Sequence, residues 1–379
     1  MNDVLLLLEE QGYDFERVIR YFPMLQELRG VEQNPVWHGE GDVFCHTRKV
    51  CHAVTSLPEW PELESMEKGM LYLAALFHDI GKKCCSRMEE GVMISPRHAI
   101  TGAGIFRELC YREQEPLTGM TYQLRETIAS LIRFHGLPQH FMEKEPVDYY
   151  LIKARENTEY PYLYLLAKAD ILGRECRDQE ELLAMADYFK EYTIELDCFY
   201  ERIPFAGEFT RHRYFQGGKI WPGEELYDTT EFTVYLMAGL PLSGKDTYIA
   251  HAFSELPVIS LDQLREEMGI RPDQGSAKVV AKAREQAKVL LRKKQPFVWN
   301  ATNIIADTRQ KLCRMFEAYG ARVHIIYLEV PYRELLERNR QRERYISEAV
   351  LERMIGKLEI PGPTEAYRVE YCISGEMTG

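Results

Sequence analysis

The sequence predicts two domains, an all-α helical bundle followed by an α/β domain with a parallel sheet. The chain has 379 residues, which is two to three times a common domain size of roughly 100–150 residues. Apolar residues recur at helical spacing up to about residue 200, whereas strand-like runs alternate with helical segments from residue 231 onward. We therefore expect domains at 1–202 and 231–379, the second ending in a C-terminal lid.

The individual elements follow from the same patterns. Helices are expected over 64–82, 121–136, 159–175 and 180–203. Strands are expected over 231–240, 257–261, 295–302 and 321–330. Prolines and glycines interrupt the chain between 203 and 230, which predicts a linker with room for a short strand or hairpin.

Composition and charge restrict the class of protein. The formal net charge is −12, which disfavours a nucleic-acid partner for the chain as a whole. Residues 230–379, however, hold 22 basic and 20 acidic residues, and eight of the basic ones lie between Arg271 and Gln295 on an expected helix. That helix is either a solvated face or a surface that follows a polynucleotide backbone. The nine cysteines show no pairing pattern, and the N-terminus resembles neither a signal peptide nor a membrane span. We expect a cytoplasmic protein with no membrane partner.

A glycine-containing loop between an expected strand and an expected helix predicts phosphate binding. Glycines allow backbone N–H groups to surround phosphate oxygens, and Lys245 adds a cation. The alternative is a turn without a ligand. We expect ATP or another NTP, with Mg²⁺ or Mn²⁺, to contact Gly239, Ser243, Gly244, Lys245, Asp246 and Thr247. The position after the lysine normally offers a hydroxyl to the metal but here is Asp246, so either Asp246 or Thr247 is the expected ligand.

Further polar residues follow the other expected strands. Asp262 after the second strand is either a general base or a helix N-cap. Arg265, on the same helical face, is placed to hold a phosphate. Thr302 and Asn303 end the third strand. Arginines after the fourth strand, among them Arg338 and Arg342, are either lid residues or part of a solvated helix face.

Residues 231–345 resemble the 5′-OH polynucleotide kinase family typified by the phage end-repair kinase. The resemblance rests on the phosphate loop, on Asp262 with Arg265, on the turn Ala301-Thr302-Asn303 and on Val330-Pro331-Tyr332-Arg333-Glu334-Leu335. The family's turn begins with an aspartate, which is absent here. The resemblance implies that Asp262 deprotonates a 5′-OH, that Lys245 and Arg342 stabilise the transferring phosphoryl group, and that substrate is held by Arg265, Thr302, Asn303 and Arg338.

Eight of the ten histidines lie before residue 230. The run Phe77-His78-Asp79-Ile80-Gly81-Lys82 resembles the HD phosphohydrolase signature, and residues 39–47 resemble the start of that pattern, which selects His46 rather than His52. In its dinuclear version the pattern implies metal ligands at His46, His78, Asp79, His98, His135 and Asp170, with Asp79 bridging two ions. Imidazole with carboxylate favours Mn, Fe, Co, Ni or Zn. Asp79 is also a catalytic candidate. Lys82 is a second one, and we expect it either to contact the phosphate or to be a surface lysine.

The two patterns together resemble the bacterial HD-Pnk end-healing enzymes. That resemblance implies a 2′,3′-cyclic phosphodiesterase or 2′- or 3′-phosphatase joined to a 5′-OH kinase, with RNA or DNA ends as substrates and a functional link to a polynucleotide ligase. One alternative is a nucleotide-metabolism protein that joins an HD nucleotidase to a small-molecule or toxin-like kinase. Another is a regulatory nucleotide-binding module whose metal is structural.

Overall fold

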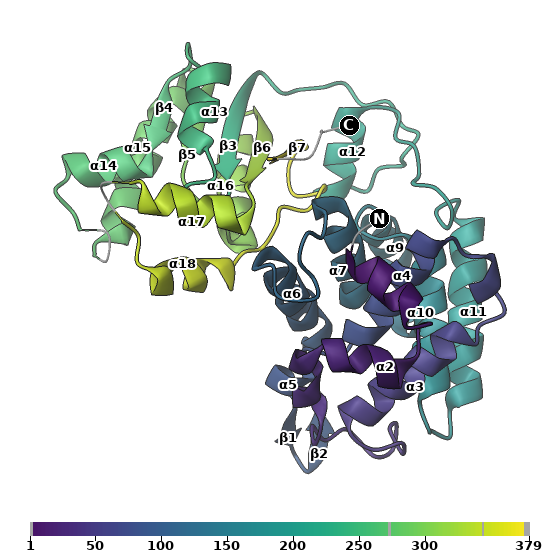
Figure 1. Ribbon diagram of the computed structural model, residues 1–379. Helices are drawn as coiled ribbons and strands as arrows, with labels where there is room; N and C mark the ends of the chain where they lie inside the picture. The colour runs from purple at the N-terminus through teal and green to yellow at the C-terminus, as the bar shows by residue number, and fades with distance from the viewer. Residues whose placement is uncertain (1–2, 272–273, 343–344, 375–379) are drawn as a thin grey trace. The chain divides into compact units, whose positions relative to one another are not determined.

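The computed structural model describes residues 3–271, 274–342 and 345–374, and the chain divides into two compact units, Met1–Ile203 and Pro204–Gly379 (Figure 1). The first unit is predominantly helical and the second is α/β, so the predicted fold class is confirmed. The domain limits proposed from the sequence differ from this division only in the segment between the two expected domains.

The helices of the first unit surround a single apolar core. Their bounds are α1 Asp3–Glu10, α2 Phe15–Val18, α3 Val43–Thr55, α4 Ser65–Phe77, α5 Lys82–Cys85, α6 His98–Tyr111, α7 Tyr122–Phe134, α8 Leu137–His140, α9 Val147–Arg155, α10 Tyr160–Gly173 and α11 Gln179–Glu195. Helix α3 packs on α4 and α10, and α7 packs on α4 and α6.

Helix α4 is the central element of this unit. A capping box begins it, with Glu64 and Glu67 exchanging side-chain and backbone hydrogen bonds. Every residue from Gly69 to Phe77 is then buried, because neighbouring helices cover all sides of α4 rather than one face. The end of α4 is therefore deep in the core, and the histidine that follows it lies there too.

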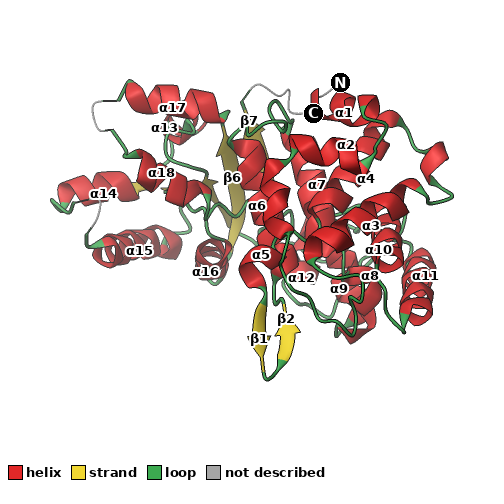
Figure 2. Ribbon diagram, turned by 60° about the horizontal axis from the view of Figure 1, so that its bottom comes forward, coloured by secondary structure: helices red, strands yellow, loops and turns green. Residues whose placement is uncertain are grey.

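A small hairpin is an addition to the predicted helical bundle. Strands β1 (Arg87–Glu89) and β2 (Val92–Ile94) pair antiparallel (Figure 2). All three β1 residues are exposed, so the segment lacks the alternation of apolar and polar residues that marks a strand in sequence.

The second unit contains a five-stranded parallel sheet of order β4-β5-β3-β6-β7. Its last strand was not predicted, because it is an edge strand with only partial burial. The bounds are α12 Glu208–Phe215, β3 Phe232–Ala238, α13 Lys245–Ala252, β4 Val258–Ser260, α14 Leu261–Glu267, α15 Ser276–Arg292, β5 Phe297–Asn300, α16 Ala306–Glu317, β6 Ala321–Glu329, α17 Tyr332–Arg340, α18 Glu348–Ile355 and β7 Arg368–Ile373.

Helices cover both faces of this sheet. Val298 of β5 packs with Ile249 of α13 in one cluster. The adjacent Phe297 and Trp299 point to the opposite face and contact Phe316 of α16. Successive strand residues face opposite sides, which explains why these strands read as continuous apolar runs. The predicted kinase-site residues follow the carboxyl ends of the strands, where ligands bind in folds of this kind.

The segment expected to be a linker contains helix α12, and α12 is part of the second unit. His212 of α12 is buried, and its Nε2 atom lies 3.5 Å from Oε1 of Glu317 at the end of α16. Burial raises the pKa of Glu317 to about 7, although Arg213 and Arg314 oppose the shift. Burial also lowers the pKa of His212 to about 4.

Among the described residues, no helix combines the length and hydropathy needed to cross a membrane.

We predict that Glu317→Gln stabilises the protein at pH 8 but not at pH 5. The folded-state pKa of about 7 lies above the unfolded value, so the wild type loses stability as the pH rises through this interval, by up to about 3 kcal/mol. Glutamine mimics the protonated carboxyl. Calorimetric unfolding at both pH values measures the difference, with the exposed Glu255→Gln as control. A stabilisation that is equal at the two pH values would contradict this assignment.

Candidate metal centre and phosphate-binding loop

The six proposed ligands of the first unit converge although they come from five separate helical segments. His46 lies in the first turns of α3, His78 caps the end of α4 and Asp79 follows it. The other three lie at the start of α6, the end of α7 and the last turn of α10, and they are His98, His135 and Asp170. All are buried except His98, whose side chain is 26% exposed and leaves the cluster open to solvent on that side.

Three of the histidines are oriented by their own helix ends. Nδ1 of His78, His98 and His135 lies 2.7–2.8 Å from the backbone carbonyl oxygen three residues earlier. An N–H must be at Nδ1 to donate to a carbonyl, so Nε2 carries the lone pair whenever the ring is neutral. Each of these Nε2 atoms faces the cluster, as a metal ligand requires.

Asp79 connects two groups of imidazoles through its two carboxylate oxygens. Its Oδ2 atom lies 3.3 Å from Nε2 of His78 and 3.7 Å from Nε2 of His46. Its Oδ1 atom lies 3.3 Å from Nε2 of His98 and 3.9 Å from Nε2 of His135. His46 Nε2 is also 3.0 Å from Oδ1 of Asp170. Asp79 thus lies between two histidine pairs, as a carboxylate that bridges two metal ions would.

Two cations stabilise the buried carboxylates. Lys82 Nζ lies 2.7 Å from Asp79 Oδ2, and Arg174 Nη2 lies 2.6 Å from Asp170 Oδ2. Burial alone would raise both carboxyl pKa values, but Lys82 holds the pKa of Asp79 well below its usual range, and Arg174 does the same for Asp170. Lys82 is itself buried and also donates to Gln33, so it is not a surface lysine.

The chemistry of the cluster fits divalent metal ions. Asp79 Oδ1 is buried and has no hydrogen-bond partner among the described residues, which is costly for a carboxylate oxygen unless a cation balances it. Burial lowers the pKa of His135 to about 3, which leaves a neutral imidazole able to ligate. The donor atoms form two candidate metal groups that share Asp79, namely His46, His78 and Asp79, and Asp79, His98 and His135. Four imidazoles with two carboxylates suit first-row transition metals.

A glycine permits this convergence. A Cβ atom at Gly81 would lie 2.0 Å from the carbonyl oxygen of His98 and 2.6 Å from the backbone nitrogen of Gly102. Only glycine therefore allows the first turn of α6 to approach the end of the HD run, and that approach places His98 beside Asp79.

Several supporting residues were not predicted from sequence. Arg174 and Gln139 both donate to Asp170, and Gln33 accepts from Lys82. Arg174 could have been found, because it lies one helical turn after Asp170. Gln139 and Gln33 are brought in only by the tertiary fold.

The phosphate loop of the second unit joins β3 to α13. Nζ of Lys245 donates to the carbonyl oxygens of Gly239 at 3.0 Å and Leu240 at 2.6 Å, and lies 3.3 Å from Oγ of Ser243. Burial lowers the pKa of Lys245 to about 8, opposed by the charges of Asp246 and Asp262. The lysine therefore lies in a loop of backbone dipoles with both carboxylates close enough to affect it.

Asp246 and Thr247 are both exposed in the first turn of α13, but they differ in support. Asn300 at the end of β5 donates to Oδ1 of Asp246 at 2.7 Å. This bond fixes the carboxylate at the carboxyl edge of the sheet, which favours Asp246 over Thr247 as a ligand for the nucleotide's metal.

Asp262 is exposed near the start of α14, and the N-cap of that helix is Ser260, whose hydroxyl accepts from Gln263 N. Asp262 is therefore not the cap and is available as a base. Arg265 donates to the carbonyls of Arg271 and Gln274 and to Ser276. In this conformation its guanidinium holds the loop before α15.

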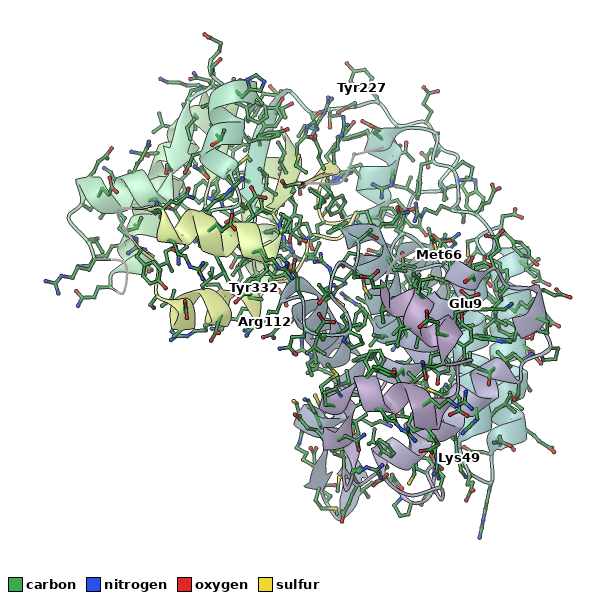
Figure 3. The ribbon with its side chains drawn as sticks, in the orientation of Figure 1. Glu9, Lys49, Met66, Arg112, Tyr227 and Tyr332 are labelled. Carbon is green, nitrogen blue, oxygen red and sulfur yellow. The ribbon has the colours of Figure 1, made fainter. Side chains whose placement is uncertain are left out.

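Four further residues were predicted to belong to the kinase site, and they differ in what they contact. Thr302 accepts a hydrogen bond from Gly239 N through its carbonyl, and Asn303 is buried and donates to Met237 O. Both support the phosphate loop. Arg338 of α17, the helix that begins at the labelled Tyr332 in Figure 3, donates to Leu242 O of the loop at 2.8 Å. Arg342 is exposed. Arg338 is thus the arginine placed at the loop.

Family models match both units. The HD domain model covers residues 43–175, and an AAA domain model of the AAA_33 type covers residues 234–361. The chain therefore joins an HD domain to an AAA domain. The first matched segment contains the six proposed metal ligands and the second contains the phosphate loop.

One solved structure matches part of the chain at low sequence identity. A crystal structure described as a "putative kinase" from Chloroflexus aurantiacus J-10-fl is 16% identical, covering 38% of this chain and 88% of that chain with a TM-score of 0.32. No curated protein matches the chain.

We predict that Asp79→Asn weakens Mn²⁺ binding to the metal-free protein by more than about 100-fold for both ions, since a change in an outer-shell partner alone typically costs ~10–100-fold. Isothermal titration measures this. The control is His52→Ala, an exposed histidine of the same helix as His46. Unchanged affinity in Asp79→Asn would exclude a bridging role.

We also predict that Asp246→Asn raises the Mg²⁺ concentration needed for ATP binding by about tenfold, because it removes the charge of a hard oxygen ligand. Thr247→Val is the matched comparison and should change this requirement much less. ATP affinity measured across a Mg²⁺ series distinguishes the two, and the reverse order would assign the ligand to Thr247.

Proposed function

We propose that the chain is a bifunctional RNA end-healing enzyme that combines a metal-dependent phosphohydrolase with an NTP-dependent 5′-OH polynucleotide kinase. The observation that carries the proposal is that one chain holds a six-residue His/Asp cluster with a shared carboxylate and a separate phosphate loop. The expected hydrolase substrates are 2′,3′-cyclic, 2′- or 3′-phosphate ends, and the two steps together would prepare ends for a ligase.

In the hydrolase unit, His46, His78, Asp79 and Asp170 would hold one ion, while His98, His135 and Asp79 would hold the other. Two bound cations would supply a water nucleophile at neutral pH and positive charge for phosphate oxygens. Lys82 keeps Asp79 ionised and adds positive charge beside the cluster. His98, the most exposed of the six, marks the side from which a phosphate ester enters.

In the kinase unit, Asp262 would accept the proton of the 5′-OH as its oxygen attacks the γ-phosphorus of the NTP. The bond from that phosphorus to the β-γ bridging oxygen breaks, and NDP leaves. Lys245 would exchange its carbonyl acceptors for phosphate oxygens, since a cation at this position stabilises the charge of phosphoryl transfer. Arg338 at the loop and Arg342 in the exposed segment would neutralise the phosphoryl group in transit.

A basic helix favours a polynucleotide acceptor over a small molecule. The exposed cations of α15 and its C-terminal end are Lys278, Lys282, Arg292, Lys293 and Lys294. Arg265 holds the loop that begins this helix and thereby links it to α14, which carries Asp262. Lys278 and Lys282 lie in the first turns of this helix, which packs on α14, whereas Lys294 at the other end pairs with Glu231 ahead of β3. Cations at the start of α15 suit a phosphate backbone, whereas a nucleoside offers no backbone to contact.

We predict that Lys278→Glu/Lys282→Glu lowers phosphorylation of a 5′-OH oligonucleotide at least tenfold and reduces its salt dependence, because phosphate contacts release counterions. ATP binding should be unchanged. Lys311→Glu on α16 is the control for reversal of one exposed lysine elsewhere on this unit. Transfer of labelled phosphate to 5′-OH RNA and to nucleosides, with hydrolysis of 2′,3′-cyclic-phosphate RNA measured across divalent metals, tests the whole proposal. Phosphate transfer to nucleosides but not to RNA would contradict the RNA end-healing function and favour a role in nucleotide metabolism.

A further inference from the structure

His46 is oriented differently from the other three histidines of the cluster. It lies inside α3 rather than at a helix end, and its Nδ1 atom lies 2.8 Å from Oε1 of Glu40 instead of a backbone carbonyl. Its Nε2 atom points to Asp170 at 3.0 Å and to Nε2 of His78 at 3.2 Å. Within the part of the chain that the structure describes, one of the two candidate subsites therefore has a carboxylate beside an imidazole Nδ1, whereas Nδ1 of His98 and His135 contacts backbone carbonyls.

Glu40 is held on three sides and is itself buried. Nδ1 of His38 lies 2.8 Å from the same Oε1 atom, and the backbone N–H of Glu175 donates to Oε2 at 2.8 Å. The Glu40 side chain has no exposed surface. The hydrogen bonds to His38 and to the Glu175 backbone fix the orientation of this carboxylate beside the His46 ring.

The same contacts connect Glu40 to the second carboxylate ligand of this subsite. Glu175 follows Arg174, which holds Asp170, and Gly39 N donates to Glu175 O at 3.0 Å. A Cβ atom at Gly39 would lie 2.9 Å from that oxygen, so glycine is required for the two loops to meet. Lys49 of α3, which is labelled in Figure 3, forms an ion pair with the side chain of Glu175.

We propose that Glu40 is a positioning residue that makes the subsite of His46, His78, Asp79 and Asp170 bind its ion more tightly than the subsite of Asp79, His98 and His135. The inference rests on the proposed hydrolase function. His46 Nδ1 and Glu40 Oε1 lie at ion-pair distance without hydrogen-bond geometry. A carboxylate charge this close to Nδ1 favours the proton on that nitrogen, which leaves the lone pair of the neutral ring on Nε2 as a metal ligand requires. A backbone carbonyl fixes the tautomer but carries no charge.

The test is a titration of the full-length, metal-free protein with Mn²⁺ in the absence of nucleotide. Wild type should bind two ions with separated affinities, and Glu40→Gln should weaken the tighter ion by about 10–100-fold while changing the weaker one by less than about threefold. Glu143→Gln is the matched control, because Glu143 pairs with Nδ1 of exposed His140 at the same 2.8 Å outside the cluster.

Two further measurements separate positioning from folding. The unfolding temperature of metal-free Glu40→Gln shows whether the fold of this loop survives the substitution. Glu40→Asp keeps the negative charge but places it farther from His46, so it should weaken binding of the tighter ion by an intermediate factor. Nitrogen-15 NMR of metal-free protein should show His46 protonated at Nδ1 in the wild type and a mixture of tautomers in Glu40→Gln.

The outcomes are distinct. Equal weakening of both ions, or no weakening of either, would overturn the positioning role of Glu40 while leaving the hydrolase proposal intact. A wild-type protein that binds Mn²⁺ but hydrolyses no phosphate end would leave the Glu40 result standing and remove the proposed function. A wild-type protein that binds no Mn²⁺ would overturn both.

Discussion

The ionised Asp79 carboxylate, buried in an apolar helical core, is the constraint on which the first unit depends. A buried charge is costly unless it is paired, and here Lys82 on one side and four imidazoles on the other surround it. Helices α4 and α7 end at the cluster and α6 begins there, so the side chains that stabilise the charge are those at these helix ends. Metal ions would supply a positively charged partner for Asp79 Oδ1, which has no hydrogen-bond partner among the described residues.

The second unit handles phosphate by a different physical means. Its charge is mostly carried by backbone dipoles at the carboxyl ends of parallel strands and at the start of α13, with Lys245 as the only buried cation among the described loop residues. Lys245 is held by carbonyl oxygens that are weaker partners than phosphate. The loop is thus preorganised for an anion, whereas the helical unit is preorganised for cations.

Outer-shell contacts distinguish the two halves of the metal cluster. Three histidines take their orientation from local helix geometry, which any chain with the same helix ends would reproduce. His46 depends on Glu40, and through Glu175 and Arg174 on the segment that carries Asp170. The two subsites therefore differ both in their ligands, since Asp170 lies on the His46 side, and in the contacts that orient their histidines. Both differences affect the order in which two ions bind.

The sequence by itself determined the two fold classes, four of the five strands of the sheet and the order of His and Asp residues along the chain, because these follow from periodicity and short motifs. It did not reveal α12 within the supposed linker, the edge strand β7 or the hairpin, since their residues are partly exposed and lack a clear period. Tertiary structure alone decided that Asp79 divides its oxygens between two histidine pairs, that Arg338 rather than Arg342 contacts the phosphate loop, and that Glu40 supports His46. These contacts join residues far apart in the chain, or depend on the direction in which a side chain leaves its helix, and no local pattern encodes either.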